Sequence, residues 1–178
     1  CPVVVGTTGW SAQHAELEAA VVQFNCPALW SPNFSVGVQL FLSIVEDAAR
    51  RFRGVHGFDV HIVETHHVAK LDAPSGTAMA IRQRAEDGLH RDVGVTSVRV
   101  GSVPGTHEVV FDGGFEQVRL VHEARDRRVF ADGAISAARW LAKRPHPALY
   151  TMRDVIETPQ GGSEHGAADG RAGVTRRE

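Results

Sequence analysis

A fully apolar strand opens the chain and restricts the folds that the chain can join. The segment C-P-V-V-V-G-T-T-G-W places Val3, Val4 and Val5 directly before a glycine-rich turn. An uninterrupted β-branched run is typical of a strand that is buried inside a parallel sheet, with neighbouring strands at both edges. No residues precede the run to supply such a neighbour. We therefore expect that the 178 residues are part of a longer protein whose N-terminal segment completes the sheet.

The order of apolar patterns predicts αβ units first, then a mostly antiparallel sheet with helices, and a final helix. Spacings of three and four predict a helix at 11–24, with Ser11 as its N-cap and Phe24 on its apolar face, and a long amphipathic helix at 35–53. A short strand is expected between these two helices. The other predicted elements are a strand at 57–64, a helix at 76–87 capped by Ser75, strands at 95–103, 106–113 and 115–124, and a helix at 131–143.

The composition is that of an ordinary globular protein and argues against several functions. A net charge of −2 gives no basic face of the kind that nucleic-acid-binding proteins need. The two cysteines, Cys1 and Cys26, are too few for a disulfide framework and favour a reducing compartment. No apolar run approaches the ~20 residues of a membrane span. We expect a cytoplasmic protein without nucleic-acid or membrane partners.

The segment E-T-H-H-V-A-K-L-D-A-P-S-G-T-A concentrates proton carriers directly before a turn. His66 and Lys70 have reference pKa values of about 6.5 and about 10.4, so each can carry a proton near neutral pH. In the turn, Ser75 can cap a helix, and the backbone N–H groups of Gly76 and Thr77 can attract an anion. Together these features predict a site that binds and protonates an acid substrate. Taken separately, they also fit a surface histidine pair and a plain helix cap.

The same segment holds potential metal ligands. They are His61, Glu64, His66 and His67. Adjacent histidines in a loop rarely share a tetrahedral ion, and no cysteine is near in the sequence. We therefore predict that the site contains no metal.

Two loops that follow predicted strands are candidates for cofactor contacts. They are V-V-V-G-T-T-G and S-P-N-F-S-V-G, the second of which offers Asn33 for a polar contact and Phe34 for packing on a flat ring. Ligands of open α/β sheets bind outside the carboxyl ends of the strands, where both loops are expected. The loops lack the full G-x-G-x-x-G fingerprint, and ordinary strand-to-helix turns fit them equally well.

The order of these motifs resembles the dihydrodipicolinate reductase (4-hydroxy-tetrahydrodipicolinate reductase) family. The similar segments are V-V-V-G-T-T-G-W, S-P-N-F-S-V-G-V, V-E-T-H-H-V-A-K-L-D-A-P-S-G-T-A, S-V-R-V-G-S-V-P-G-T-H-E-V-V-F, H-E-A-R-D-R-R-V-F-A-D-G-A and M-R-D-V-I, within residues 2–156. The resemblance implies an α/β fold, with the last strands of a Rossmann-type dinucleotide-binding domain at 1–34. An α+β substrate-binding and oligomerisation domain with a mixed, mostly antiparallel four-stranded sheet would follow at 35–128. A helix at 129–157 would return to the first domain, and 158–178 would form a disordered tail.

The resemblance also implies a reaction. Members reduce a small cyclic dicarboxylate, 4-hydroxy-tetrahydrodipicolinate or dihydrodipicolinate, with NADH or NADPH in the diaminopimelate route to lysine, and they form homotetramers. His66 is then expected to be the catalytic proton donor and acceptor, and Lys70 the catalytic proton donor. The implied substrate-binding residues are His67, Gly76 and Thr77. The implied cofactor-binding residues are Gly6, Thr7, Thr8, Ser31, Pro32, Asn33, Phe34 and Arg127.

One departure from the family limits what these residues can do. The family's glycine-rich fingerprint and the residue that selects NADH or NADPH belong to a region that precedes residue 1 of this sequence, so we expect the 178 residues alone to be inactive. Two alternatives remain open. One is a Schiff-base lyase with Lys70 as the nucleophile, and the other is a non-catalytic module that only binds or oligomerises.

Overall fold

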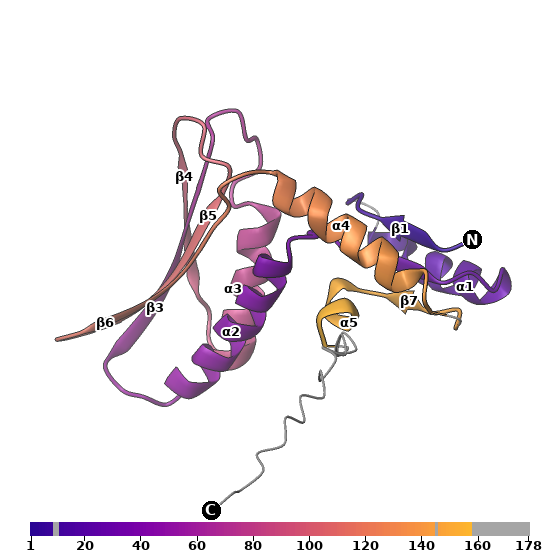
Figure 1. The fold of residues 1–178 in the computed structure, drawn as a ribbon. Coiled ribbons are helices and arrows are strands. Elements are labelled where there is room, and N and C mark those ends of the chain that lie inside the picture. The colour runs from indigo at the N-terminus through magenta and orange to yellow at the C-terminus, as the bar shows by residue number, and fades with distance from the viewer. Residues whose placement is uncertain (9–10, 145, 158–178) are drawn as a thin grey trace, which may run out of the picture.

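The computed structural model describes residues 1–8, 11–144 and 146–157 (Figure 1). The elements in chain order are β1 (Val3–Val5), η1 (Ser11–Gln13), α1 (His14–Gln23), β2 (Ala28–Trp30), α2 (Val36–Phe52), β3 (Phe58–His66), α3 (Gly76–Leu89), β4 (Gly94–Arg99), β5 (Thr106–Gly113), β6 (Gln117–Glu123), α4 (Arg128–Leu141), β7 (Leu149–Tyr150) and α5 (Met152–Glu157). They form two sheets, which lie at opposite ends of the molecule in Figure 1, with α4 running between them.

The smaller sheet contains the apolar strand that opens the chain. Its order is β1-β2-β7, and both pairings are parallel, which confirms the predicted parallel strand at Val3–Val5. The predicted burial between two neighbours is not seen among the described residues, because β1 is an edge strand and Val3 is 47% exposed. Leu29, in the central strand, is fully buried and packs with residues of α4 and α5, among them Leu141 and Met152. This core is small because each of its elements buries only a few apolar side chains.

The larger sheet has the order β4-β3-β5-β6. β4 pairs with β3 in parallel, whereas β5 pairs with β3 and β6 in antiparallel register. The predicted mixed, mostly antiparallel four-stranded sheet is therefore confirmed. Residues of β3 alternate between buried and accessible, and the buried ones, including Val60 and Ile62, face the helices.

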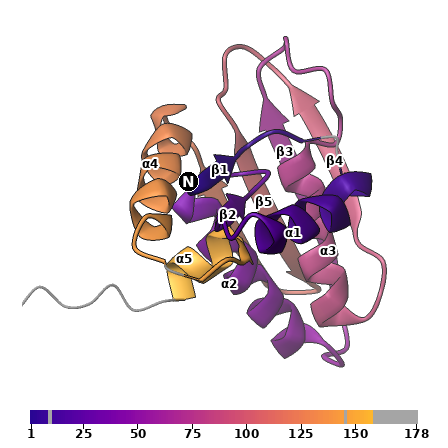
Figure 2. The same cartoon turned by 90° about the vertical axis from the view of Figure 1, so that its right-hand side faces the viewer.

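Two helices cover one face of this sheet (Figure 2), while the other face stays bare in the described part of the chain (Figure 1). Apolar residues recur every three or four positions along α2, so Phe41, Val45 and Ala49 all point into the core. Ser35 caps α2, and its side-chain oxygen accepts from the N–H of Val38.

Two glycines let helices approach their neighbours closely. A Cβ at Gly88 of α3 would lie 2.5 Å from the Cβ of Ala49 on α2. A Cβ at Gly133 of α4 would lie 1.8 Å from the carbonyl oxygen of Phe34. The second contact fixes α4 against the loop that leaves β2, and this loop reappears in the site described below.

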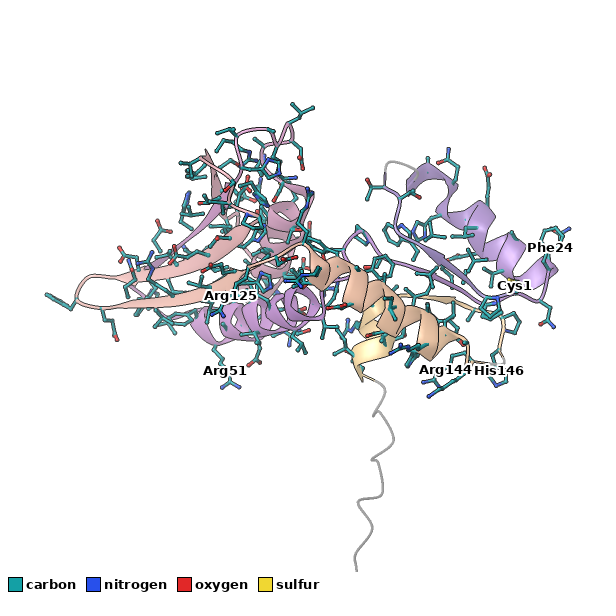
Figure 3. All side chains as sticks on the ribbon, turned by 45° about the horizontal axis from the view of Figure 1, so that its top comes forward. Cys1, Phe24, Arg51, Arg125, Arg144 and His146 are labelled. Atoms are coloured by element: carbon teal, nitrogen blue, oxygen red, sulfur yellow. The ribbon has the colours of Figure 1, made fainter. Side chains whose placement is uncertain are left out.

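Several local predictions were wrong. The first α-helix begins at His14, after the 3-10 turn at Ser11–Gln13, and Gln13 rather than Ser11 is its N-cap. Phe24 was expected on the apolar face, yet it is 70% exposed and points away from the core at the end of α1 (Figure 3). Strand β7 and helix α5 were not predicted as elements, because two and six residues give too little periodicity to detect.

Other predicted elements differ in their bounds. The strand predicted at 57–64 continues to His66, and the strand predicted at 95–103 ends at Arg99. The span 129–157, predicted as a helix, contains α4, β7 and α5. Ser75 caps α3 as predicted. The predicted tail at 158–178 lies outside the described residues, and the proposed domain boundaries at 34 and 128 stay predictions. Among the described helices, none combines the length and the apolar character that crossing a bilayer requires.

Candidate active site

One pocket of about 510 Å³ brings together most of the predicted site residues. It lies between the C-terminal end of β3, the start of α3, the start of α4 and the loops after β1 and β2. The predicted residues that line it are Gly6, Thr8, Pro32, Asn33, Phe34, His66, His67, Lys70, Gly76, Thr77 and Arg127. A volume of this size is typical of small-molecule sites, which range over ~300–1,000 Å³.

His66 is the last residue of β3, and only 7% of its surface is exposed. Its Nδ1 hydrogen-bonds Oε2 of Glu64, two residues earlier on the same face of the strand. Burial lowers the pKa of His66, and the nearby charges of Lys70 and Arg99 lower it further, against the opposing effect of Glu64. The imidazole is therefore neutral at neutral pH.

Glu64 is fully buried but remains ionised. Burial by itself raises its pKa, but the hydrogen bond from Arg99 and the interaction with His66 lower the pKa to about 2. Its Oε1 accepts from Nη2 of Arg99 at 2.7 Å and from the N–H of Ser75 at 3.3 Å. Both carboxylate oxygens are thus engaged with the protein.

Lys70 lies in the turn after β3, where its N–H donates to the carbonyl of His67. Its Nζ forms an ion pair with Oδ1 of Asp72 at 2.6 Å. The hydrogen bond from Lys70 lowers the pKa of Asp72, with the N–H of Gly76 adding to the effect. The ammonium group and the amide therefore already attract a carboxylate, which in this structure belongs to Asp72.

The N-terminus of α3 forms one wall of the pocket. Ser75 caps the helix, because its side-chain oxygen accepts from the N–H of Ala78 at 3.1 Å. A Cβ at Gly76 would meet no atom within 4 Å, so this part of the wall is open to a ligand. The first backbone N–H groups of a helix lack partners within the helix and favour anions. This geometry fits the predicted anion seat.

The loops of the smaller sheet form the opposite wall. Asn33 donates from Nδ2 to Oγ1 of Thr77 at 3.0 Å, which links the loop after β2 to the start of α3. Gly6 lies against Phe34, since a Cβ there would be 3.2 Å from a carbon of the Phe34 ring. The lack of a side chain at Gly6 therefore lets this ring pack against the backbone.

Thr7 and Ser31 do not line the pocket. The carbonyl of Thr7 accepts from the indole N–H of Trp30, and this places Thr7 beside β2. Ser31 is buried, and its hydroxyl donates to the carbonyl of Asn33 at 2.6 Å. Ser31 therefore shapes the loop that carries Asn33.

The comparisons with known proteins identify the family. A family model described as "Dihydrodipicolinate reductase, C-terminus" matches residues 37–156. The chain belongs to the dihydrodipicolinate reductase family. It is 43% identical to the 4-hydroxy-tetrahydrodipicolinate reductase of Methanoculleus marisnigri over 86% of this chain and 66% of that protein. It is 38% identical to the protein of the same name from Archaeoglobus fulgidus, over 87% of this chain and 66% of the relative. The chain thus spans slightly less than two-thirds of these curated relatives.

A solved structure supports the fold. The dipicolinate-bound dihydrodipicolinate reductase from Paenisporosarcina sp. TG-14 matches with a TM-score of 0.65, over 84% of this chain and 62% of that one. The two sequences are 24% identical, so this similarity bears on the fold alone.

Sequence reasoning missed residues of this reductase-family site that come from β4 and β5. Arg99 binds Glu64, and His107 packs edge-on against His66 with 5.2 Å between ring centroids. His107 is buried, and burial followed by the charge of His66 lowers its pKa to about 4. The motifs R-V-G and P-G-T-H were noted only as similar segments, because nothing local indicates that they face β3.

Three donor groups in the described part of the chain approach one another closely enough to share an ion. Ligand atoms of Glu64, His66 and His107 lie within 4.8 Å of one another. We do not assign a metal site, because the guanidinium of Arg99 already binds Glu64 and would repel a cation beside it. That the site contains no metal stays a prediction.

Proposed function

We propose that the complete protein containing this chain reduces 4-hydroxy-tetrahydrodipicolinate, or dihydrodipicolinate formed from it, to tetrahydrodipicolinate in lysine biosynthesis. One observation supports this most strongly. A histidine, a lysine and an open helix N-terminus meet in a single pocket whose other wall carries Gly6, Asn33 and Phe34. Membership of the reductase family supports the same reaction.

The substrate is proposed to rest on the wall formed by α3. One of its carboxylates would accept from the N–H groups of Gly76 and Thr77, in the place that the Asp72 carboxylate approaches in this structure. The ammonium of Lys70 and the side chain of His67 line the same pocket and complete a polar surface for a cyclic dicarboxylate. Displacing Asp72 from Lys70 would free the ammonium for the substrate.

The residues of the pocket also fit a nicotinamide cofactor. Gly6 and Phe34 line the pocket together with Thr8, Pro32 and Arg127, and they offer backbone and an aromatic ring to a cofactor. NADH or NADPH, when bound, supplies the hydride that reduces the substrate ring. Lys70 would donate the one proton that the added hydride requires, while Nε2 of His66 would accept a hydrogen bond. A positioned acid contributes typically ~10²–10⁴ in rate.

The 178 residues alone are proposed to bind the dicarboxylate but not to turn it over. Their sequence contains no G-x-G-x-x-G fingerprint to hold a dinucleotide pyrophosphate. The salt bridge to Asp72 argues against the Schiff-base alternative, because an ammonium group has no lone pair with which to attack a carbonyl. Borohydride trapping of a substrate adduct on Lys70 would reverse this conclusion.

The bare face of the larger sheet is proposed to contact a second copy in a homotetramer. The strand registers place Val63, Val98, Val110 and Val121 on that face. Val121 is 55% exposed. Sedimentation analysis of V121E should show smaller assemblies than the wild type, whereas V22E, on the exposed side of α1, should not. An unchanged mass for V121E would refute this interface.

Two substitutions test the catalytic roles. In the complete protein, K70A and H66A should each lower kcat by ~10²–10⁴ and leave the folded state intact, since each removes a proton carrier. K143A and H56A are matched controls, because Lys143 is the other lysine of the sequence and both residues are exposed. The measurement is steady-state oxidation of NADH and of NADPH. Turnover close to the wild-type value in both site variants would remove these roles.

A further inference from the structure

The catalytic histidine is held by a buried ionic network that extends over three parts of the fold. Glu64 and His66 lie on β3, Arg99 lies on β4, and Ser75 caps α3. In the parallel register of the two strands, His66 is opposite Arg99. This places the guanidinium beside the carboxylate of Glu64, which points the same way as His66.

We propose that Glu64, anchored by Arg99, is a positioning residue that fixes the tautomer and ring orientation of His66. The mechanistic consequence rests on the proposed function, whereas the effect on the ring itself does not.

The hydrogen-bonding pattern determines which ring nitrogen carries the proton. An ionised carboxylate has no proton to donate and only accepts, so Nδ1 of His66 must be the donor to Glu64. A neutral imidazole has a single N–H, and its proton is therefore on Nδ1. Nε2 is left with a free lone pair. This nitrogen lies on the side of Gly105, where an added Cβ would be 3.0 Å away.

The charge of Glu64 is needed for this arrangement. A neutral Glu64 could itself donate a proton to Nδ1 and allow the opposite tautomer. Arg99 prevents this, because its bond to Oε1 at 2.7 Å helps to keep the carboxylate ionised despite full burial. A buried carboxylate without such a partner becomes protonated instead.

Arg99 also connects the network to the lysine turn. The same Nη2 that binds Glu64 donates to the carbonyl oxygen of Asp72 at 2.5 Å. The N–H of Ser75 reaches Oε1 of Glu64 at 3.3 Å. Glu64 and Arg99 therefore set the position of the turn between Lys70 and the cap of α3, as well as that of His66.

Other charged or titratable groups face His66 from every neighbouring element. Lys70 and Asp72 lie in the turn, Arg99 on β4, His107 on β5 and His122, behind His107, on β6. The cations among them lower the pKa of His66, whereas Glu64 raises it. Removing the charge of Glu64 should therefore lower the pKa of His66 further and release the constraint on its tautomer.

A spectroscopic experiment tests the positioning role without requiring activity. The 178-residue chain, labelled with ¹⁵N-histidine, is compared in three forms: wild type, E64Q and E46Q. Glu46 is a matched control, because it is also bound by arginines, Arg50 and Arg84, but lies on α2 away from the pocket. The His66 signals are assigned with an H66A variant.

In the wild type and in E46Q, the His66 ring should show a protonated Nδ1 and an unprotonated Nε2 at neutral pH. In E64Q the two tautomers should mix, and the titration midpoint of His66 should fall. Identical His66 signals in all three forms would overturn the proposal. If E64Q does not fold, E64D keeps the charge but shortens the reach, and it should show the same loss of Nδ1–H preference to a smaller extent.

Kinetics of the complete protein then separate the two proposals. E64Q should lower kcat roughly 10- to 100-fold with little change in KM. This loss of kcat is smaller than the one expected for K70A or H66A. E64Q should also shift the acidic limb of the pH profile. E64D should recover part of the loss. A wild-type kcat and pH profile in E64Q would overturn the positioning role. A wild-type protein without NAD(P)H-dependent reduction would instead refute the proposed function, while the tautomer result would stand.

Discussion

The two sheets of this molecule differ in how much they bury and in what they bury. The larger sheet and α2 and α3 enclose a core that includes Val45, Ile62 and Phe111, all fully buried. The smaller sheet has strands of three, three and two residues and a smaller core around Leu29. Because buried apolar area is the main stabilising contribution, the larger unit is expected to resist opening more strongly.

The buried polar groups show the same contrast. In the described part of the chain, the buried titratable side chains are Glu64, His66 and His107, and all belong to the larger sheet. The loops of the smaller sheet contribute hydroxyl and amide groups to the site, such as those of Thr8 and Asn33. The residues proposed to transfer protons therefore lie on the unit that is expected to be more rigid. Most residues proposed to meet the cofactor lie on the unit that is expected to open more easily, and this division would suit the proposed binding and release of a nucleotide.

Hydrogen exchange should give the largest difference between the two units. Amides of β3 and β5 should exchange at least ~10³-fold more slowly than those of β1 and β7, since local opening free energies range from about zero to the global value. The measurement is native-state exchange of the 178-residue chain, read residue by residue. Equal protection in both sheets would show that they unfold as one unit and would remove the contrast.

Acid should destabilise the larger unit selectively. The pKa of His107 is lowered by burial from 6.5 to about 4, so the unfolded chain binds a proton more readily than the folded one between these values. Stability is therefore expected to fall from about pH 6.5 to pH 4, by up to about 3 kcal/mol. Glu64, whose pKa is lowered from 4.5 to about 2, should add a further loss below pH 4.5.

Urea unfolding of the wild type and of H107Q at several pH values measures this effect. H107Q removes the titrating group, so its unfolding free energy should change less between pH 7 and pH 4 than that of the wild type. H14Q, on α1 beside the smaller sheet, provides the control and should keep the wild-type slope. Parallel pH dependences for H107Q and the wild type would place the acid sensitivity elsewhere.

The smallest expected effect concerns the two serine caps. S75A and S35A each remove an N-cap bond, to Ala78 in α3 and to Val38 in α2, at a cost of about 0.5–2 kcal/mol. S75A should also weaken binding of pyridine-2,6-dicarboxylate, because it disturbs the helix start that forms the anion seat. Thermal unfolding and titration calorimetry of the two variants give the comparison. Equal dicarboxylate affinities in S75A and S35A would argue against that seat.

Much of the fold and part of the site followed from local patterns. The apolar run at Val3–Val5, the amphipathic spacing of 35–53 and the cap at Ser75 are short-range signals, and the structure confirms the elements that they predict. The failures lie where local signals are weak or are overridden. Helix α1 has only a weakly amphipathic pattern, and the assignment of Phe24 to its apolar face was therefore wrong.

The sequence by itself determined which groups are available for chemistry: His66, Lys70 and the turn before α3 are adjacent in the chain and recognisable as a motif. Only the tertiary structure decided how those groups are held. Arg99 and His107 are 33 and 41 residues from His66 along the chain, and strand pairing alone brings them beside it. Pairing register depends on the packing of the whole sheet against α2 and α3, and no short stretch of sequence encodes that.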